Sequence, residues 1–142
     1  ARYYNDVWRS TDNGATWKLV NGSAGWSPRV LHNLLSMPDG SIVLIGGGNK
    51  EYFNGLTDMW RSTDSGSTWS VVNTSASWPV RLSQKSVVLP DGSIVLVGGM
   101  ADKTVNDVWR FTTAGSTGPS PVHLSTMPGN VTVHLPLFKT GK

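Results

Sequence analysis

The 142-residue sequence contains no cysteine, a single glutamate (Glu51) and few charged residues. Without cysteine there are no disulfides, thiolate metal ligands or thiol nucleophiles. Charged residues make up 15 % of the chain, against roughly 25 % in an ordinary soluble domain, and a composition with a single glutamate argues against a helical bundle. Apolar runs such as Ile42 to Ile45 are far shorter than the roughly 20 residues of a membrane span.

The net charge of +3 does not indicate a nucleic-acid partner, because the basic residues are scattered singly rather than gathered in a run. What the chain does contain is 16 glycines, seven tryptophans and many serines, threonines and asparagines. Seven tryptophans argue against a disordered chain. The length fits one domain, and we therefore predict an all-β domain with many turns.

An internal repeat is the strongest signal in the sequence. A shift of 52 residues aligns positions 5–47 with 57–99 without a gap, and 24 of the 43 pairs are identical. A third copy begins at Asn106, 49 residues after the second, and then decays: it reads Phe-Thr-Thr-Ala-Gly over 111–115 where the first two read Ser-Thr-Asp-x-Gly, and no tryptophan follows. We predict repeats over 1–113 with copies starting near 5, 57 and 106, a linker-like segment over 114–121, and a C-terminal strand or tail over 122–142.

Each copy has the pattern of short strands separated by turns. Ser41 to Ile45 and Ser93 to Val97 follow Pro-Asp-Gly and end at Gly-Gly, and further strands are expected over Tyr4 to Ser10, Thr16 to Val20 and Arg29 to Ser36. Four strands in about 50 residues predict the four-stranded blade of a β-propeller. The chain supplies about two and a half blades. Because propellers have roughly four to eight, the ring stays incomplete unless chains self-associate.

Two motifs carry a resemblance to known families. Residues 10–17 and 62–69 both follow Ser-x-Asp-x-Gly-x-Thr-Trp, which resembles the Asp-box of sialidase-type propellers. Gly-Gly at 46–47 and at 98–99, each followed by Asp-x-Trp, resembles a kelch repeat. The combined unit, over about residues 3 to 113, is most similar to kelch-like repeats of archaeal (methanogen) and bacterial cell-surface proteins.

This resemblance implies a structural role for the Asp-box. Its aspartate accepts backbone hydrogen bonds, its glycine supplies a positive φ, and its tryptophan packs between sheets. The residues expected in this role are Ser10, Asp12, Gly14, Trp17, Ser62, Asp64, Gly66 and Trp69.

The sequence predicts that the protein is not an enzyme. The sialidase-like family needs a Tyr/Glu pair, but Glu51 and Tyr52 are adjacent and would point to opposite faces of a strand. Kelch-type copper oxidases need a tyrosine linked to cysteine, which this chain lacks. The histidines, His32, His123 and His134, are not spaced as metal ligands. We expect no metal and no cofactor.

Trp26 and Trp78, with Arg29 and Arg81, are the candidate ligand-binding residues. The two tryptophans follow strands in equivalent connections. As exposed stacking platforms they would make the protein a lectin-like carbohydrate-binding module. As buried residues they would pack on a neighbouring blade. The sequence leaves both alternatives open.

Three Asn-x-Ser/Thr sequons, at Asn21, Asn73 and Asn130, are candidate N-glycosylation sites. Asn130 to Leu135 alternates as a strand does, and could close its own sheet, be donated to another copy, or open an Ig-like module. Taken with the resemblance, these features predict an extracellular or cell-surface structural or adhesive protein that self-associates through its blades. The alternative is the carbohydrate-binding module, and a sialidase-type hydrolase comes third.

Overall fold

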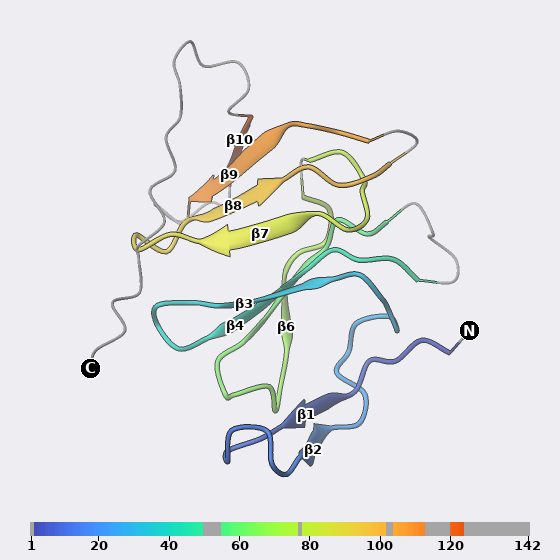
Figure 1. The fold of residues 1–142 in the computed structure, drawn as a ribbon, viewed down its shortest axis with the longest axis vertical. Helices are drawn as coiled ribbons and strands as arrows, with labels where there is room; N and C mark the ends of the chain where they lie inside the picture. Colours follow the sequence, from blue (N-terminus) through green and yellow to red (C-terminus); the bar gives the residue numbers. More distant parts are fainter. Residues whose placement is uncertain (1, 50–54, 77, 102–103, 113–119, 124–142) are drawn as a thin grey trace.

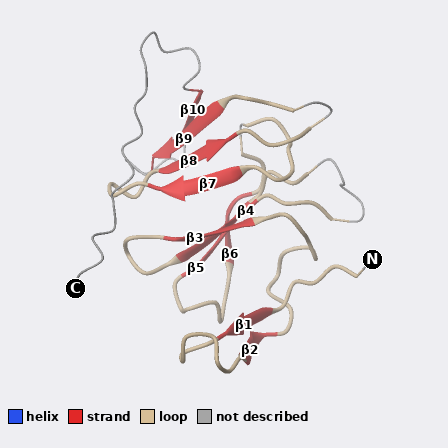
Figure 2. Ribbon diagram, viewed as in Figure 1, coloured by secondary structure: helices blue, strands red, loops and turns tan. Residues whose placement is uncertain are grey.

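The computed structural model describes residues 2–49, 55–76, 78–101, 104–112 and 120–123. These residues form ten short strands, and the described part contains no helix (Figure 2). The strands make three antiparallel sheets that follow one another along the longest axis of the molecule (Figure 1). The predicted fold class, all-β with an incomplete set of propeller-type blades, is confirmed.

We name the sheets blade 1, blade 2 and blade 3 in chain order. Blade 1 contains β1 (Val7–Arg9) and β2 (Lys18–Asn21). Blade 2 contains β3 (Asn33–Ser36), β4 (Ile42–Ile45), β5 (Met59–Ser62) and β6 (Ser70–Asn73), paired in that order. Blade 3 contains β7 (Lys85–Val88), β8 (Ile94–Val97), β9 (Val108–Thr112) and β10 (Ser120–His123), also paired in order.

The 52-residue repeat is also visible in the strands. β1 and β2 correspond to β5 and β6, and both β1 and β5 have a register shift just before their tryptophan. Blade 1 thus corresponds to the second half of a blade. β3 contacts β7, so the first strands of blades 2 and 3 face each other.

Local backbone chemistry explains where the strands begin and end. β4 and β8 are apolar, largely β-branched runs, and each follows a Pro-Asp-Gly turn whose glycine has a positive φ, 80° at Gly40 and 78° at Gly92. The strand expected over Arg29 to Ser36 is shorter, because Leu31 has a φ of 59°, which no strand accommodates. The strand expected from Tyr4 begins only at Val7.

The apolar core lies between neighbouring blades. The larger cluster joins blades 2 and 3 and contains the buried residues Leu35, Val43, Ile45, Met59, Ala76, Trp78, Ile94, Leu96 and Phe111. The smaller one joins blades 1 and 2 and contains Ala24, Trp26 and Leu44, with Val7, Trp60 and Trp69 packed against it. Since each blade buries its apolar side chains against the next, packing between blades supplies the main hydrophobic stabilisation.

Blade 3 is completed by its own chain. β10 pairs antiparallel with β9, from Ser120 opposite Thr112 to His123 opposite Trp109. The strand therefore begins inside the segment expected to be a linker, 114–121. The strand expected over Asn130 to Leu135 lies outside the described residues. No helix of the described part is long and apolar enough to cross a membrane.

Candidate functional site

The first Asp-box-like turn is held by hydrogen bonds within itself. Asp12 accepts from the backbone N–H of Thr16 at 2.9 Å, from the Thr16 hydroxyl at 2.5 Å and from the Ser10 hydroxyl at 2.6 Å. Ser10 Oγ in turn accepts from the backbone N–H of Gly14 at 2.9 Å. Hydrogen bonds from Ser10 and Thr16 lower the pKa of Asp12 to about 2.

The second turn repeats this geometry. Asp64 accepts from the Thr68 N–H at 2.8 Å, from the Thr68 hydroxyl at 2.6 Å and from the Ser62 hydroxyl at 2.8 Å. The Thr68 bonds, followed by that from Ser62, lower the pKa of Asp64 to about 2. Both oxygens of this carboxylate are engaged inside the turn. These contacts support the structural role, which remains a prediction.

The tryptophans of the two turns differ in their surroundings. Trp17 and Trp69 donate their indole N–H to the carbonyls of Gly14 and Gly66, at 3.1 and 3.0 Å. Trp69 is half-buried, whereas Trp17 is 59 % exposed. The same local turn is therefore covered in blade 2 and uncovered in blade 1.

Trp26 and Trp78 are not exposed stacking platforms. They are 5 % and 2 % exposed and pack edge-on against aromatic rings of the following blade. The ring centroids lie 4.5 Å apart for Trp26 and Trp69 and 4.6 Å apart for Trp78 and Phe111. Of the two alternatives left open by the sequence, the structure selects packing on a neighbouring blade, because a flat aromatic ring fills the seam between two sheets.

Arg29 is likewise buried rather than available to a ligand. Its side chain is 1 % exposed and forms a bidentate pair with Asp58, at 2.7 and 2.8 Å, while Nη1 also donates to the Gly46 carbonyl at 2.9 Å. Burial raises the pKa of Asp58, but hydrogen bonds from Arg29 and Trp60 outweigh it and the net shift is downward. The ligand-binding role predicted for Arg29 is corrected to a buried ion pair.

Arg81 repeats this arrangement in the next seam. Its side chain is fully buried, pairs with Asp107 through both Nη atoms, and donates to the Gly98 and Pro79 carbonyls at 3.0 Å each. Hydrogen bonding from Arg81 lowers the pKa of Asp107 to about 2, against the opposing effect of burial. The prediction for Arg81 is corrected in the same way.

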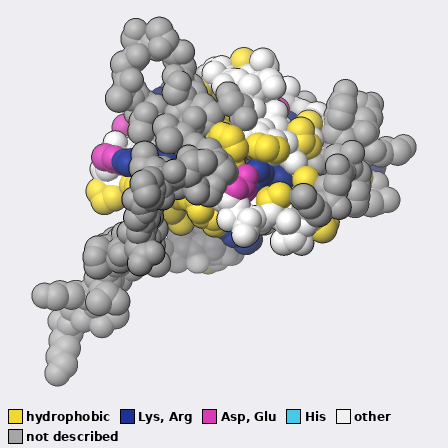
Figure 3. All heavy atoms as spheres, turned by 90° about the horizontal axis from the view of Figure 1, so that it is seen from above, with side chains coloured by type: hydrophobic (Ala, Val, Ile, Leu, Met, Phe, Trp, Pro, Cys, Tyr) yellow, Lys and Arg dark blue, Asp and Glu magenta, His cyan; other side chains and the backbone are white. Residues whose placement is uncertain are grey.

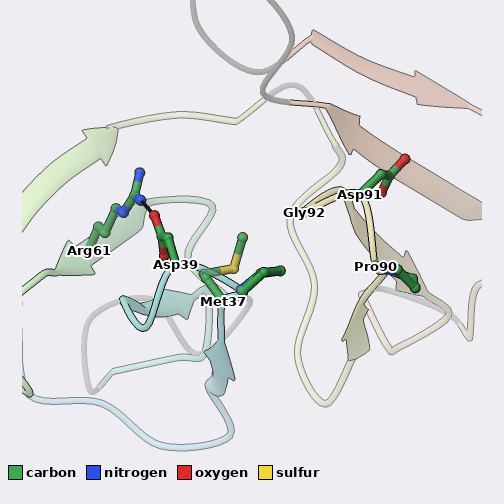
Figure 4. Close-up of a pocket in the computed structure, with 7 residues that line it drawn as sticks. Met37, Asp39, Arg61, Pro90, Asp91 and Gly92 are labelled. Carbon is green, nitrogen blue, oxygen red and sulfur yellow. Dashed lines mark hydrogen bonds and ion pairs between the residues drawn. The ribbon is translucent and has the colours of Figure 1, made fainter.

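A groove lies between the Pro-Asp-Gly turns of blades 2 and 3. Its volume is about 280 Å³. It is lined by Met37, Pro38, Asp39, Arg61, Pro90, Asp91 and Gly92. Figure 4 shows the turn that carries Met37 and Asp39 on one side and the turn that carries Pro90 and Asp91 on the other, with Asp39 directed to Arg61. None of the ligand-binding candidates named from the sequence lines this groove.

One wall of the groove carries a rigid unit of three polar side chains, which we call the Asp–Ser–Arg unit of blade 2. Asp39 Oδ1 accepts from the backbone N–H and the hydroxyl of Ser41, at 3.0 and 2.6 Å, and Asp39 Oδ2 pairs with Arg61. Arg61 Nε donates to Ser41 Oγ at 3.0 Å. Ser41 is buried, but the side chains of Asp39 and Arg61 are 55 % and 37 % exposed.

Asp91, which lines the opposite wall, belongs to the equivalent unit of blade 3. Asp91 accepts from the N–H and hydroxyl of Ser93, at 2.9 and 2.6 Å, and pairs with Arg110 at 2.5 Å. Hydrogen bonds from Ser93 lower the pKa of Asp91, and those from Ser41 lower the pKa of Asp39. Both carboxylates are thus ionised at neutral pH. Figure 3 shows the molecule from above, turned by 90° from the view of Figure 1, and acidic and basic side chains lie next to one another on this face.

Sequence reasoning missed this groove, although its signal was present. The Pro-Asp-Gly triplets were predicted to form turns alone, and Arg61 was not a candidate, although Arg9, Arg61 and Arg110 recur in register. A residue that recurs in every blade can line a groove between blades. Only tertiary structure shows that two such turns lie side by side.

The asparagines of the first two sequons, Asn21 and Asn73, both form hydrogen bonds within the chain. Asn21 Oδ1 accepts from the Ser23 N–H at 2.8 Å, and Asn21 Nδ2, the atom a glycan would use, donates to the Ser67 carbonyl at 2.8 Å. Asn73 Oδ1 accepts from the Ser75 N–H at 2.9 Å. Asn130 lies outside the described residues. Glycosylation remains a prediction.

Comparison with known proteins gives one sequence relative and two structural neighbours of note. No family model matches the chain. A xyloglucanase from Paenibacillus sp. is 29 % identical over 133 residues, which cover 80 % of this chain and 13 % of the relative. The chain therefore corresponds to a small part of that enzyme.

The structural neighbours share the fold. A fungal alcohol oxidase of the AA5 family, in complex with copper, has a TM-score of 0.61 at 18 % identity, covering 90 % of this chain and 28 % of the oxidase. YjhT has a TM-score of 0.58 at 16 % identity, covering 83 % of this chain and 38 % of YjhT. At these identities the likeness concerns the fold alone.

The relative is an enzyme, and this match overturns the prediction that the protein is not one. That prediction weighed only the catalytic patterns visible in this chain. Because the chain matches 13 % of the relative's length, most of the relative has no counterpart in it. The absence of a catalytic motif from so short a segment is no argument against an enzyme.

Proposed function

We propose that this chain forms blades of a polysaccharide-degrading enzyme, and that the groove between its Pro-Asp-Gly turns binds a neutral polysaccharide. The similarity to a xyloglucanase supports a carbohydrate-related function. The observation that carries the proposal is the groove itself, where Asp39 and Arg61 of blade 2 and Asp91 of blade 3 present exposed charged groups beside apolar side chains.

The chemistry of this groove suits a sugar chain. A neutral sugar offers hydroxyl groups that both donate and accept, together with an apolar face of C–H groups. Asp39 and Asp91 can accept from hydroxyls, Arg61 can donate to them, and Met37 and Pro38 supply apolar contact. Hydrogen bonds to charged groups are the stronger ones. Since each carboxylate is already held by its serine, little side-chain conformational freedom is lost on binding.

The groove has the properties of a binding site rather than a hydrolytic centre. Glycoside hydrolysis needs one carboxyl that keeps its proton near neutral pH, through a raised pKa. The described aspartates with a shifted pKa are all shifted downward: Asp12, Asp39, Asp58, Asp64, Asp91 and Asp107. The proton donor of the proposed hydrolase is therefore a residue other than these six.

The test is binding of xyloglucan oligosaccharides to the 142-residue chain, measured by titration calorimetry. Arg61→Gln removes the donor that faces the groove, and we expect the affinity to fall at least about tenfold, since hydrogen bonds to charged groups contribute about 1.5–3 kcal/mol. Arg9→Gln is the matched control, because Arg9 occupies the equivalent position in β1, is exposed and does not line the groove.

Both variants should keep their thermal stability, because the Arg61–Asp39 pair is exposed and water screens pairs of that kind. Equal loss of binding in Arg61→Gln and Arg9→Gln would place the sugar elsewhere. Absence of binding by the unmodified chain to xyloglucan and to other neutral glucans would refute the proposal.

A further inference from the structure

Blade 1 exposes an aromatic surface that its counterpart in blade 2 covers. Trp8 and Trp17 are 51 % and 59 % exposed, whereas Trp60 and Trp69, their equivalents 52 residues later, are half-buried. We call the surface formed by Asp6, Trp8 and Trp17 the Trp8–Trp17 face.

This face is fixed in the same geometry as the covered one. Trp8 Nε1 donates to Asp6 Oδ2 at 2.7 Å, as Trp60 Nε1 donates to Asp58 Oδ2 at 2.7 Å. Trp17 is tied to its turn through the Gly14 carbonyl, as Trp69 is through Gly66. Both exposed indoles are therefore held in place before anything docks on them, which reduces the entropic cost of binding.

What covers the equivalent surface in blade 2 is a short segment from the preceding blade. Trp26 packs on Trp60 and Trp69, with ring centroids 6.2 and 4.5 Å away and interplanar angles of 68° and 90°. Three residues later, Arg29 forms its bidentate pair with Asp58. The covering segment thus has the pattern Trp-x-x-Arg, an aromatic ring followed by a guanidinium.

The seam between blades 2 and 3 uses the same pattern. Trp78 packs on Phe111, and Arg81 pairs with Asp107. Asp6 is the counterpart of Asp58 and Asp107. Among the described residues, no arginine pairs with Asp6.

We propose that the Trp8–Trp17 face is a docking site for a Trp-x-x-Arg segment of a further blade. The tryptophan of that segment packs on Trp8 and Trp17, and its arginine pairs with the carboxylate of Asp6. This inference does not depend on the proposed sugar-binding groove, which lies between blades 2 and 3 and shares no residue with the face.

The identity of the docking partner follows from where this chain's own Trp-x-x-Arg segments are bound. Its sequence contains two Trp-x-x-Arg segments, at 26–29 and 78–81, and both are engaged within the chain. Residues 124–142 contain neither tryptophan nor arginine. A folded second copy therefore has no such segment to offer, and the partner is a blade distinct from the three described here.

The experiment fuses a copy of residues 22–32 to the N-terminus of the chain through a flexible Gly/Ser linker, which holds the segment at roughly millimolar effective concentration. We expect a blue shift of tryptophan emission and a melting temperature higher by at least about 3 °C, a change that a stabilisation of roughly 1 kcal/mol produces in a domain of this size. The matched control carries Ala in place of Trp26 in the fused copy.

Asp6→Asn in the chain tests the charged half of the site. It should reduce the gain in melting temperature for the fused wild-type segment but not for a segment with Gln in place of Arg29. Trp8 and Trp17 are more than half exposed, so Trp8→Ala and Trp17→Ala should fold, and each should abolish the gain.

Three results would overturn the proposal. The first is an equal gain with the wild-type and Trp26→Ala segments. The second is quenching of the fluorescence by xyloglucan oligosaccharides that is lost in Trp8→Ala, which would make the face a sugar platform. The third is a dimer of the unfused chain, detected by light scattering and lost in Trp17→Ala, which would make the occupant a second copy.

Discussion

Replacing Asp107 by Asn should destabilise the protein far more than the same replacement at Asp91. Both aspartates pair with an arginine. The Arg81 side chain has no exposed surface and Asp107 keeps 17 %, whereas Arg110 and Asp91 are 36 % and 56 % exposed. Asp107→Asn leaves a buried guanidinium without its counter-charge, although the Gly98 and Pro79 carbonyls still accept from it.

The magnitude follows from this difference in burial. Removing one partner of a buried ion pair costs about 3–5 kcal/mol. Because the carboxylate of Asp107 keeps some contact with water, we expect a value at the lower end, about 3 kcal/mol. At Asp91, where water screens both charges, the expected loss is far smaller. Each asparagine keeps the shape of the side chain, so the two variants differ chiefly in the burial of the partner.

Urea unfolding followed by circular dichroism gives both free energies of unfolding. A double variant, Arg81→Met with Asp107→Asn, should be less destabilised than the sum of its single variants, because it leaves no unpaired buried charge. Losses below 1 kcal/mol for Asp107→Asn, with an equal effect at Asp91, would refute the argument that Arg81 is a buried structural residue. Arg81 would then again be a candidate for ligand binding.

Three further predictions concern the seams and the turns. Trp78→Ala should cost about 3–5 kcal/mol of unfolding free energy, since a large side chain that is 2 % exposed leaves a cavity; a loss under 1 kcal/mol in urea unfolding would contradict its place in the core. Gly55→Ala should cost about 3 kcal/mol or more of unfolding free energy, because φ is +112° there and a Cβ would overlap the Arg81 carbonyl. Gly40 has a φ of +80° but open space around it, so Gly40→Ala should cost about 1 kcal/mol in the same urea unfolding measurement. The pKa of Asp64 should be about 2 in the folded protein. Its contribution to stability is therefore complete above its ordinary pKa of 3.8 and is lost as the pH falls toward 2. An NMR titration that gave a pKa near 3.8 would show that the turn does not stabilise the carboxylate.

Much of the fold was predictable because its determinants are local. The Pro-Asp-Gly triplets, the β-branched runs after them and the 52-residue period together gave short strands in four-stranded units. Departures came where the backbone turns without a proline or glycine to mark it. The positive φ of Leu31 and Ser83, which shortens β3 and β7 at their starts, has no such signature.

The candidate site was less predictable, because its residues come from two blades. Arg29 and Arg81 looked like ligand residues, being polar residues near loop tryptophans, and proved to be buried in ion pairs with aspartates 29 and 26 residues away. Asp39 was expected only as part of a turn and Arg61 was not a candidate, yet both line a groove. Both the buried and the exposed Arg–Asp ion pairs recur at equivalent positions of the repeat, so repetition alone does not show which pairs are buried.

The sequence by itself determined the class of the fold, the strands, the turns and the repeat, since these depend on backbone preferences over a few residues. It also determined which side chains recur together, Trp-x-x-Arg with Asp-x-Trp among them. Tertiary structure decided which of those recurring groups are buried, because burial depends on the blade that packs alongside. Trp26 and Arg29 fill a seam, whereas Trp8, Trp17 and Asp6 carry the same chemistry on a face that no described blade covers.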